Sequence, residues 1–196
     1  MIPVIVLAGG AARRFGSNKL LAELNGLPLV MHAPLRLQKA GGFDVIVMTC
    51  HEEVKQLCDE AGLTCLFRSL CKEGLSGSVR AASEHLMERG VPAAVFCGGD
   101  QPFLTAETMM TFYCAWQSSG KGLGSCMAEG LATNPTIFSL KYYKDLTALA
   151  GDTGGRAVLR ANEADCFFYE LADPHEIMDI DLPQQLEDAR KGAKRR

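Results

Sequence analysis

A glycine-rich segment near the start of the chain concentrates positive charge in a form that suits phosphate groups. It follows a short apolar run and contains Gly9, Gly10 and three cations, Arg13, Arg14 and Lys19. Because two successive glycines have no Cβ, they let the backbone turn sharply and let a phosphate approach its N–H groups. Arginine grips phosphate oxygens as a planar fork, and lysine adds a point charge. The segment therefore predicts a site for a polyphosphate.

Acidic residues at two later positions could hold a divalent cation against those phosphates. Asp100 follows an apolar run typical of a buried strand, which places its carboxylate at the sheet edge expected for the first loop. Mg²⁺ prefers few carboxylates, several waters and phosphate oxygens, whereas a turn aspartate would only cap the next segment. Asp181 is a second candidate ligand, and strand-like alternation would put it on one face with Asp179. Its alternative role is to cap the last helix.

Three polar residues in later loops are candidates for contacts with substrates. Ser78 lies where a glycine-rich loop enters a helix, so its hydroxyl could bind a base or a phosphate, or could cap the helix. Asn134 precedes a proline, and Arg156 follows a Gly-Asp-Thr-Gly-Gly turn. Arg156 could clamp an acceptor phosphate or lie on a helix surface. No G-x-S-x-G segment occurs, so we expect the nucleophile to come from a substrate.

Strands and helices alternate along most of the chain, which predicts how these residues are positioned. The pattern indicates an α/β fold, with a mostly parallel central sheet between two layers of helices, and ligands at the carboxyl ends of the strands. Strands are expected at residues 4–7, 45–48, 63–67, 93–97, 122–127, 135–138, 166–171 and 177–180. Helices are expected at residues 28–40, 51–61, 105–116, 140–149, 156–161 and 183–191, and one reaching residue 86 after a loop at 74–80. An irregular loop is expected at 129–134.

The composition excludes several classes of protein. With 196 residues, 47% hydrophobic content and a net charge of −3, the chain suits one domain at residues 1–190, with a basic, disordered tail at 191–196. Its charge gives no reason to expect nucleic acid, and no apolar stretch suits a membrane helix. Without a secretory signal, we expect a cytoplasmic protein whose eight cysteines are reduced. A zinc site is the weaker alternative, at His51, Cys58, Cys65 and Cys71.

The first motif resembles the signature of nucleotidyltransferases with a Rossmann-like fold, L-A-G-G-x-x-x-R-x-G-x-x-K. The matching residues are Leu7, Ala8, Gly9, Gly10, Arg14, Gly16 and Lys19. The spacing is neither that of a Walker loop nor that of the G-x-G-x-x-G fingerprint. Further segments resemble, in order, elements of the molybdenum cofactor cytidylyltransferases: residues 74–79, 99–102, 134–135, 151–156 and 179–183. The Leu-Ala-Gly-Gly stretch resembles the guanylyl branch as much as the cytidylyl one.

The resemblance implies a three-layer nucleotidyltransferase fold and transfer of CMP from CTP to molybdopterin, with Mg²⁺ as cofactor and pyrophosphate as product. It implies that the product then passes to a molybdoenzyme. It also implies the site residues. The nucleotide would be bound by Leu7, Ala8, Gly9, Gly10, Arg14, Lys19 and Ser78. The catalytic residues would be Arg14, Lys19 and Asp100. The metal ligands would be Asp100 and Asp181, and the acceptor would be bound by Asn134 and Arg156.

Other interpretations stay open. GTP could replace CTP as donor, and a sugar or polyol phosphate could replace molybdopterin as acceptor. From another class of protein, a nucleotide-binding regulator or a cofactor-insertion chaperone would bind without turnover. The presence of both Lys19 and Asp100 favours turnover, because binding alone needs neither a placed metal nor a matched cation. A nicotinamide-dependent oxidoreductase is disfavoured by the missing G-x-G-x-x-G.

Overall fold

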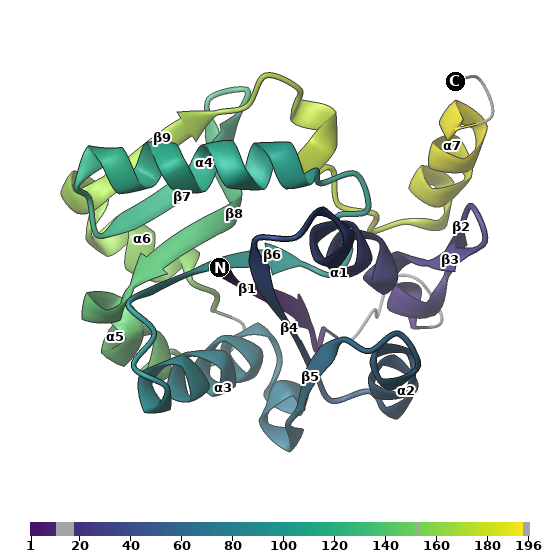
Figure 1. Cartoon of the computed structure of the whole chain (residues 1–196), viewed down its shortest axis with the longest axis horizontal. Helices are drawn as coiled ribbons and strands as arrows, with labels where there is room; N and C mark the ends of the chain where they lie inside the picture. The colour runs from purple at the N-terminus through teal and green to yellow at the C-terminus, as the bar shows by residue number, and fades with distance from the viewer. Residues whose placement is uncertain (11–17, 152, 194–196) are drawn as a thin grey trace.

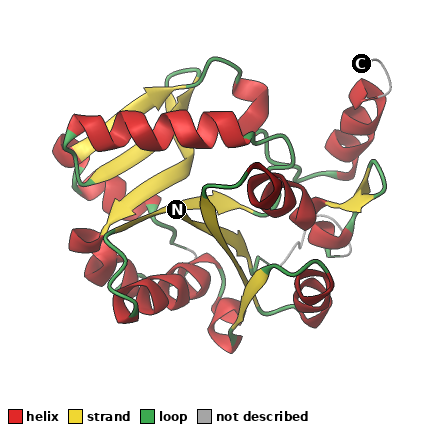
Figure 2. Ribbon diagram, viewed as in Figure 1, coloured by secondary structure: helices red, strands yellow, loops and turns green. Residues whose placement is uncertain are grey.

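A seven-stranded sheet with helices on both faces forms the centre of the computed structural model, which describes residues 1–10, 18–151 and 153–193 (Figures 1 and 2). The spatial order is β5-β4-β1-β6-β8-β7-β9. The strands are β1 (Ile2–Ala8), β4 (Phe43–Thr49), β5 (Thr64–Phe67), β6 (Ala93–Gly98), β7 (Leu123–Ala128), β8 (Leu131–Ser139) and β9 (Cys166–Glu170). β8 pairs antiparallel with β6 and β7, and the other pairs in this sheet are parallel. The expected mostly parallel α/β fold is confirmed.

Three helices pack on each face of the sheet. One face is covered by α1 (Leu29–Ala40), α2 (Glu52–Glu60) and α4 (Ala106–Ser119). The other is covered by α3 (Leu75–Glu88), α5 (Tyr143–Thr147) and α6 (Arg156–Ala161). Figure 1 shows α7 (Pro183–Ala193) away from these layers, against the small hairpin of β2 (Glu23–Leu24) and β3 (Leu27–Pro28). Short 3-10 turns complete the chain at η1 (Lys19–Leu21), η2 (Ser69–Glu73), η3 (Leu140–Tyr142), η4 (Glu163–Asp165) and η5 (Pro174–Ile177).

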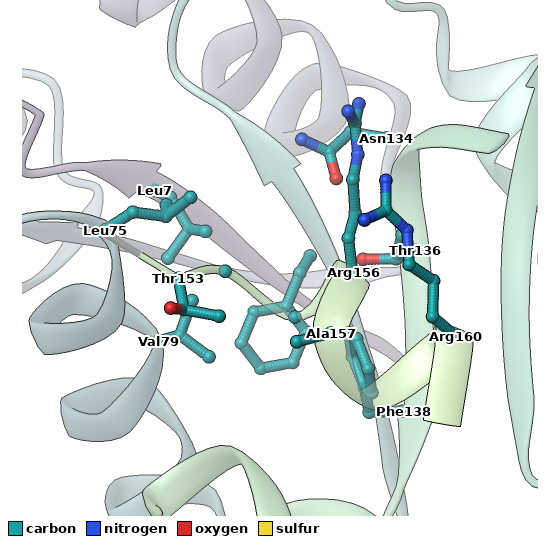
Figure 3. Close-up of a pocket in the computed structure, with 13 residues that line it drawn as sticks. Leu7, Leu75, Val79, Asn134, Thr136, Phe138, Thr153, Arg156, Ala157 and Arg160 are labelled. Atoms are coloured by element: carbon teal, nitrogen blue, oxygen red, sulfur yellow. The ribbon is translucent and has the colours of Figure 1, made fainter. Parts of the chain in front are cut away.

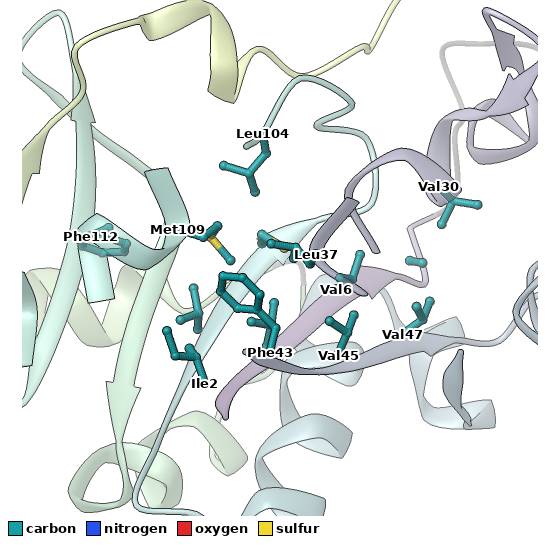
Figure 4. Close-up of a cluster of buried hydrophobic side chains, with 14 of the residues drawn as sticks. Ile2, Val6, Val30, Leu37, Phe43, Val45, Val47, Leu104, Met109 and Phe112 are labelled. Atoms are coloured by element: carbon teal, nitrogen blue, oxygen red, sulfur yellow. The ribbon is translucent and has the colours of Figure 1, made fainter. Parts of the chain in front are cut away.

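Alternation along β1 divides the core into two apolar clusters. Val4 and Val6 belong to the cluster under α1 and α4, whereas Ile5 belongs to the cluster under α3. Figure 4 shows the first cluster, in which Val6 lies with Val45 of β4 and Leu37 of α1. A strand that is apolar on both faces suits the centre of a covered parallel sheet. The sheet therefore gives its carboxyl edge, where β1 and β6 end, a rigid base.

Helix α3 begins earlier than the sequence suggests. The expected loop at residues 74–80 is helical from Leu75 onward, and Gly74 occupies the capping position. Ser78 therefore lies inside the helix, so the alternative that it caps the helix is wrong. The Ser76 hydroxyl, in the same first turns, donates to the carbonyl oxygen of Gly151. A partner 75 residues away thus ties the start of α3 to the loop before α6.

Two further segments differ from expectation because of turn geometry and distant contacts. Residues 129–134 form no irregular loop: a tight turn at Glu129 and Gly130, both with positive φ, joins β7 directly to β8. Residues 177–180 form no strand, because Ile177 ends η5 and the following segment is held by a bond from Ile180 N to Asp100 O at 3.0 Å. α7 continues to Ala193, past the start of the expected tail at residue 191.

The cysteines carry neither a disulfide nor a metal cluster in the part of the chain that the structure describes. All eight are free, and six of them are buried. No set of three or more metal-ligating His, Cys, Asp or Glu side chains occurs among the described residues. The alternative zinc site at His51, Cys58, Cys65 and Cys71 is therefore not formed. No described helix combines the length and the apolar character needed to span a lipid bilayer.

Candidate active site

Lys19 joins two aspartates from distant parts of the chain at the carboxyl edge of the sheet. Its Nζ lies 2.6 Å from Asp100 Oδ2 and 2.5 Å from Asp181 Oδ1. The side chains of Lys19 and Asp100 are 14% and 23% exposed, whereas that of Asp181 is 50% exposed. We call these three residues the charged cluster. Three residues that the sequence singles out are thus brought together in one place.

The turn after β6 positions Asp100 at the end of β1. Gly99 N donates to Leu7 O at 2.9 Å, which ties the turn to the neighbouring strand. A Cβ on Gly98 would lie 2.3 Å from Asp100 Oδ1, so only glycine leaves room for the carboxylate to fold back. Buried Gln101 supports the turn from below: its Oε1 accepts from Gly98 N at 3.1 Å and its Nε2 donates to Ile177 O at 3.2 Å. The carboxylate is therefore held in place by backbone contacts.

Asp181 reaches the same point because its neighbour is anchored. Ile180 is fully buried in the small cluster between α7 and the β2–β3 hairpin, and its N–H donates to Asp100 O. Gln185 Oε1 accepts from the backbone N–H groups of Asp181 and Leu182, each at 2.8 Å. Because a glutamine of α7 satisfies these amides, the Asp181 carboxylate is free to face Lys19. The Asp181 carboxylate thus pairs with Lys19 in the charged cluster, and its role as a metal ligand stays a prediction.

Lys19 keeps its positive charge in this setting. It begins η1, where Asn18 Oδ1 accepts from Leu20 N at 3.2 Å and the buried Leu20 fixes the turn. Burial alone would lower the pKa of Lys19, but the carboxylates of Asp100 and Asp181 outweigh it, and the pKa lies above its usual value. The lysine is therefore a permanent cation at physiological pH.

The carboxylates of the charged cluster fit a small divalent cation. Asp100 and Asp181 converge on a single Nζ, so one ion of similar size and greater charge can contact both. Mg²⁺ in nucleotide sites takes one or two carboxylates, with waters and phosphate oxygens as its other ligands. Burial, together with the charges of Asp100 and Asp181, raises the pKa of neighbouring Asp179 to about 6. The shift arises first from burial of Asp179 and second from the two neighbouring carboxylates.

Gly9 lies against the first turns of α3. A Cβ at this position would stand 2.4 Å from Ser78 Oγ and 2.8 Å from Cys71 Cβ. Ser78 is 2% exposed, and its Oγ has no hydrogen-bond partner among the described residues. The structure thus places the serine and the glycine-rich motif side by side, as expected for residues that share a ligand. Of the other residues expected to bind nucleotide, Leu7, Ala8 and Gly10 lie at the same strand end, and Arg14 falls outside the described residues with Arg13 and Gly16.

A pocket of about 440 Å³ opens beside α6, and we call it the α6 pocket (Figure 3). Its described lining consists of Leu7, Leu75, Val79, Phe96, Asn134, Thr136, Phe138, Thr153, Gly154, Gly155, Arg156, Ala157 and Arg160. Figure 3 shows the polar ends of Asn134, Arg156 and Arg160 gathered at one side, with Leu7 and Leu75 at the other. The two residues expected to bind the acceptor, Asn134 and Arg156, therefore share one cavity.

Glycines and long-range bonds shape the wall of the α6 pocket. A Cβ on Gly154 would lie 2.6 Å from Leu75 Cδ2, and one on Gly155 would lie 2.6 Å from Phe138 Cζ. The loop can therefore settle onto α3 and β8 only because these positions are glycine. Arg156 Nη2 donates to Thr133 Oγ1 at 3.4 Å, which links α6 to β8. These contacts hold α6 at the mouth of the pocket.

Sequence reasoning missed several residues of this pocket. Phe96 and Phe138 form its apolar floor and meet edge to face, with ring centroids 5.4 Å apart. No local signal marks them, because they read as ordinary core residues of two strands. Arg160 did leave a signal, since it lies four residues after Arg156 on the expected helix, and positions four apart share a helix face.

The α6 pocket and the charged cluster flank the ends of the same two strands. In the register of β1 and β6, Leu7 lies opposite Gly98, two residues before Asp100. Leu7 also lines the pocket, together with Phe96 of β6. The charged cluster and a cavity with positively charged groups therefore border one strand end, where the glycine-rich motif begins. Such an arrangement can hold two phosphorylated ligands near one metal ion.

Comparison with known proteins agrees with this geometry. A probable molybdenum cofactor guanylyltransferase of Pyrococcus horikoshii is 34% identical over 102 residues, which are 52% of this chain and 50% of the relative. The corresponding protein of Thermococcus gammatolerans is 29% identical over 116 residues, 59% of this chain and 57% of the relative. The chain thus spans about half the length of the curated relatives it matches.

The fold and the family are also recognised over longer stretches. A nucleotidyl transferase from Methanothermobacter thermautotrophicus superimposes with a TM-score of 0.80 and 19% identity, covering 100% of this chain and 98% of that one. This likeness shows the nucleotidyltransferase fold. The family model described as "MobA-like NTP transferase domain" matches residues 4–166. The resemblance read from the sequence motifs is confirmed, and the chain belongs to the family of MobA-like NTP transferase domains.

Proposed function

We propose that this chain is a Mg²⁺-dependent nucleotidyltransferase that joins a nucleoside monophosphate to the phosphate of molybdopterin and releases pyrophosphate. The observation that carries the proposal is the charged cluster, in which Lys19, Asp100 and Asp181 converge beside the glycine-rich motif. Binding of a nucleotide without turnover would need no such arrangement of a cation with two carboxylates. The guanylyltransferase relatives and the family match support the same reaction class.

The reaction is a displacement at the α-phosphorus of the nucleotide. An oxygen of the acceptor phosphate forms a bond to the α-phosphorus. The bond between the α-phosphorus and the oxygen that bridges it to the β-phosphorus breaks. The electron pair leaves with pyrophosphate, so no protein nucleophile takes part. Catalysis then depends on in-line positioning and on cations placed where negative charge develops.

The residues of the charged cluster and of the glycine-rich motif each have a role in that displacement. Bound Mg²⁺ would neutralise phosphate charge, and Asp100 and Asp181 would hold it. Lys19 would turn from the carboxylates to the triphosphate, where it contacts the leaving group. Gly9, Gly10 and Ser78 would border the nucleotide, and Arg14 is expected from the motif alone to grip its phosphates.

The α6 pocket supplies the acceptor site on this proposal. Asn134 and Arg156 line it, and its floor of aromatic and aliphatic side chains suits a flat ring. A volume of about 440 Å³ is within the range of small-molecule sites. The combination of an apolar floor and a polar rim supports a pterin phosphate as acceptor over a sugar or polyol phosphate, which would need more hydroxyl partners.

Two donors are supported by different observations. The segments at 74–79, 99–102 and 179–183 resemble the cytidylyl branch and favour CTP. The Leu-Ala-Gly-Gly stretch, together with the names of the relatives in Pyrococcus and Thermococcus, favours GTP. We take CTP as the donor and GTP as the second candidate.

Pyrophosphate release with molybdopterin, Mg²⁺ and each of CTP, GTP, ATP and UTP tests the proposal. Pyrophosphate release with CTP alone is the expected result. Release with GTP alone would show that GTP is the donor and would leave the proposed reaction type unchanged. Binding of nucleotide without any release, in the presence of acceptor, would overturn the enzyme in favour of a regulator or an insertion chaperone. Release only with sugar or polyol phosphates would overturn the acceptor.

A further inference from the structure

Arg160 lies one helical turn after Arg156 and lines the same pocket. The intervening Val158 and Leu159 are buried in the core under α3 and α5, which fixes the rotation of α6. Because residues four apart share a helix face, the two guanidinium groups are directed to the same side. Figure 3 shows both side chains extending from α6 towards the level of Asn134.

The charges of these two arginines are not neutralised by the described protein. Neither forms an ion pair with a residue that the structure describes. The described lining of the pocket contains two arginines and no acidic residue. By contrast, the guanidinium of Arg89, which follows the last residue of α3, lies 3.4 Å from the carboxylate of Asp44. The α6 pocket therefore presents two exposed positive charges that an anionic ligand can balance.

A phosphomonoester balances that charge better than other common groups. It carries close to two negative charges at neutral pH and offers three acceptor oxygens. One guanidinium can bind two of those oxygens as a fork, and a second can bind the remaining oxygen. A carboxylate or a phosphodiester carries a single charge and would leave one arginine unmatched.

The remainder of the pocket is apolar and suits the body of such a ligand. Phe96 and Phe138 form the floor, and Leu75 and Val79 of α3 form one wall. Aromatic side chains favour stacked or edge-on contacts with flat rings. The chemistry of the pocket thus describes a flat heterocycle with a terminal phosphate.

We propose that Arg160 is a specificity-determining residue, which together with Arg156 selects acceptors that carry a phosphomonoester on a flat ring. The assignment rests on the proposed function, because it names the acceptor class of that reaction. Arg156 also donates to Thr133, whereas no protein partner of Arg160 is found among the described residues. Arg160 is therefore the arginine whose guanidinium is available to the ligand alone.

Direct binding separates this role from turnover. The probe is neopterin monophosphate, a fluorescent pterin with a phosphomonoester, and its partner is neopterin, which lacks the phosphate. The wild-type protein should bind neopterin monophosphate at least about tenfold more tightly than neopterin, as expected for charge-assisted hydrogen bonds. The Arg160→Gln variant should bind neopterin monophosphate about tenfold more weakly than wild type, and its affinity for neopterin should be unchanged. Arg160→Lys should recover part of the loss, because it restores the charge but not the fork.

Arg89→Gln is the matched control, since it removes one positive charge from an exposed residue at the end of α3, outside the pocket, and should change neither affinity. The inference is overturned if Arg160→Gln weakens both probes equally, or weakens neither, or if wild type does not distinguish them. In steady state, Arg160→Gln should raise KM for the acceptor and leave KM for the nucleotide unchanged. If no nucleotide yields pyrophosphate but the phosphate-dependent loss at Arg160 is found, the nucleotidyl-transfer proposal fails and the pocket assignment stands.

Discussion

In the charged cluster one lysine faces two carboxylates, whereas in the α6 pocket two arginines face no described acid. Both regions border the ends of β1 and β6, and both consist of residues far apart in the sequence. Every charge of the cluster has an opposite charge in contact within the protein, with one carboxylate in excess, whereas the two arginines of the pocket have no described acidic partner. The two regions therefore respond to ligands in different ways.

The difference indicates which region has to rearrange. Lys19 occupies the place where a divalent cation would contact Asp100 and Asp181, so metal binding requires the lysine to give up both contacts. On the proposed function, a triphosphate would offer it replacement partners, which would couple metal and nucleotide binding. In the α6 pocket no ion pair among the described residues has to be broken, so an acceptor would meet two exposed cations directly.

Asp100→Asn should have the largest effect on this arrangement. It removes a metal ligand and a partner of Lys19, so pyrophosphate release should fall about 10²–10³-fold, a loss typical of removing one electrostatic contact at a reacting centre. The fold should persist, because Gly99 N and Ile180 N are bonded to backbone atoms. Stopped pyrophosphate assays with a thermal melt check both statements. Asp44→Asn, which removes a carboxylate far from the site, is the control, and equal activities of the two variants would contradict the metal role of Asp100.

Lys19→Met tests whether the lysine competes with the metal. Activity should fall about 10²-fold, since a cation at the phosphates is lost. In the absence of nucleotide, however, Mn²⁺ should bind about fivefold more tightly, because the competing charge accounts for ~1 kcal/mol at a distance of a few ångströms in water. Calorimetric titration of nucleotide-free protein measures this. The double variant with Asp100→Asn should lose the gain, and weaker Mn²⁺ binding in Lys19→Met alone would show that no competition exists.

Gly9→Ala addresses the contact between the glycine-rich motif and α3. A Cβ at this position would overlap Ser78 Oγ and press on Cys71, both buried side chains. Overpacking of this kind destabilises a protein by about 1–3 kcal/mol, and the shift should also weaken nucleotide binding. Gly10→Ala is a suitable comparison, since its Cβ would meet no atom of the described residues within 4 Å. Equal unfolding free energies of the two variants in urea would disprove the close packing.

Local patterns predicted the parts of the site that depend on neighbouring residues. The apolar run of β1 followed by Gly9 and Gly10 identifies a strand and its turn, and the same logic locates Asp100 after β6. Both predictions succeed because a buried strand and its glycine turn are specified within about ten residues. The helix expected from residue 105 is found as α4, where Thr105 is the cap and its Oγ1 accepts from Thr108 N at 3.1 Å.

Long-range contacts determine the parts that could not be predicted. Asp181 reads equally well as a helix cap, and the bond from Ile180 to Asp100, across 80 residues, makes it part of the charged cluster. Ser76 lies inside α3, where its hydroxyl donates a hydrogen bond to the carbonyl oxygen of Gly151. The spacing of Arg156 and Arg160 is visible in the sequence, but the strands that form the floor beneath them are not adjacent to α6 in the chain.

Asp165 is a carboxylate that should stabilise the fold without taking part in the reaction, in contrast to the carboxylates of the charged cluster. It accepts from Tyr142 Oη at 2.6 Å, from Gly122 N at 3.2 Å and from Lys141 Nζ at 3.1 Å. These bonds, Tyr142 foremost, lower the pKa of Asp165 to about 2. Asp165→Asn should therefore cost about 1 kcal/mol of unfolding free energy at pH 7 and leave pyrophosphate release unchanged.

The stabilisation contributed by Asp165 should decrease as the pH falls. The folded-state pKa of Asp165 lies below the unfolded value of about 3.9, so its contribution is complete above that value and disappears as the pH falls towards 2. The difference in urea unfolding free energy between wild type and Asp165→Asn should be constant from pH 7 to 5 and should shrink at pH 4 and 3. A difference that grew on acidification would contradict the bonding of this carboxylate. A loss of activity at pH 7 would contradict the separation between carboxylates that stabilise the fold and those that serve the reaction.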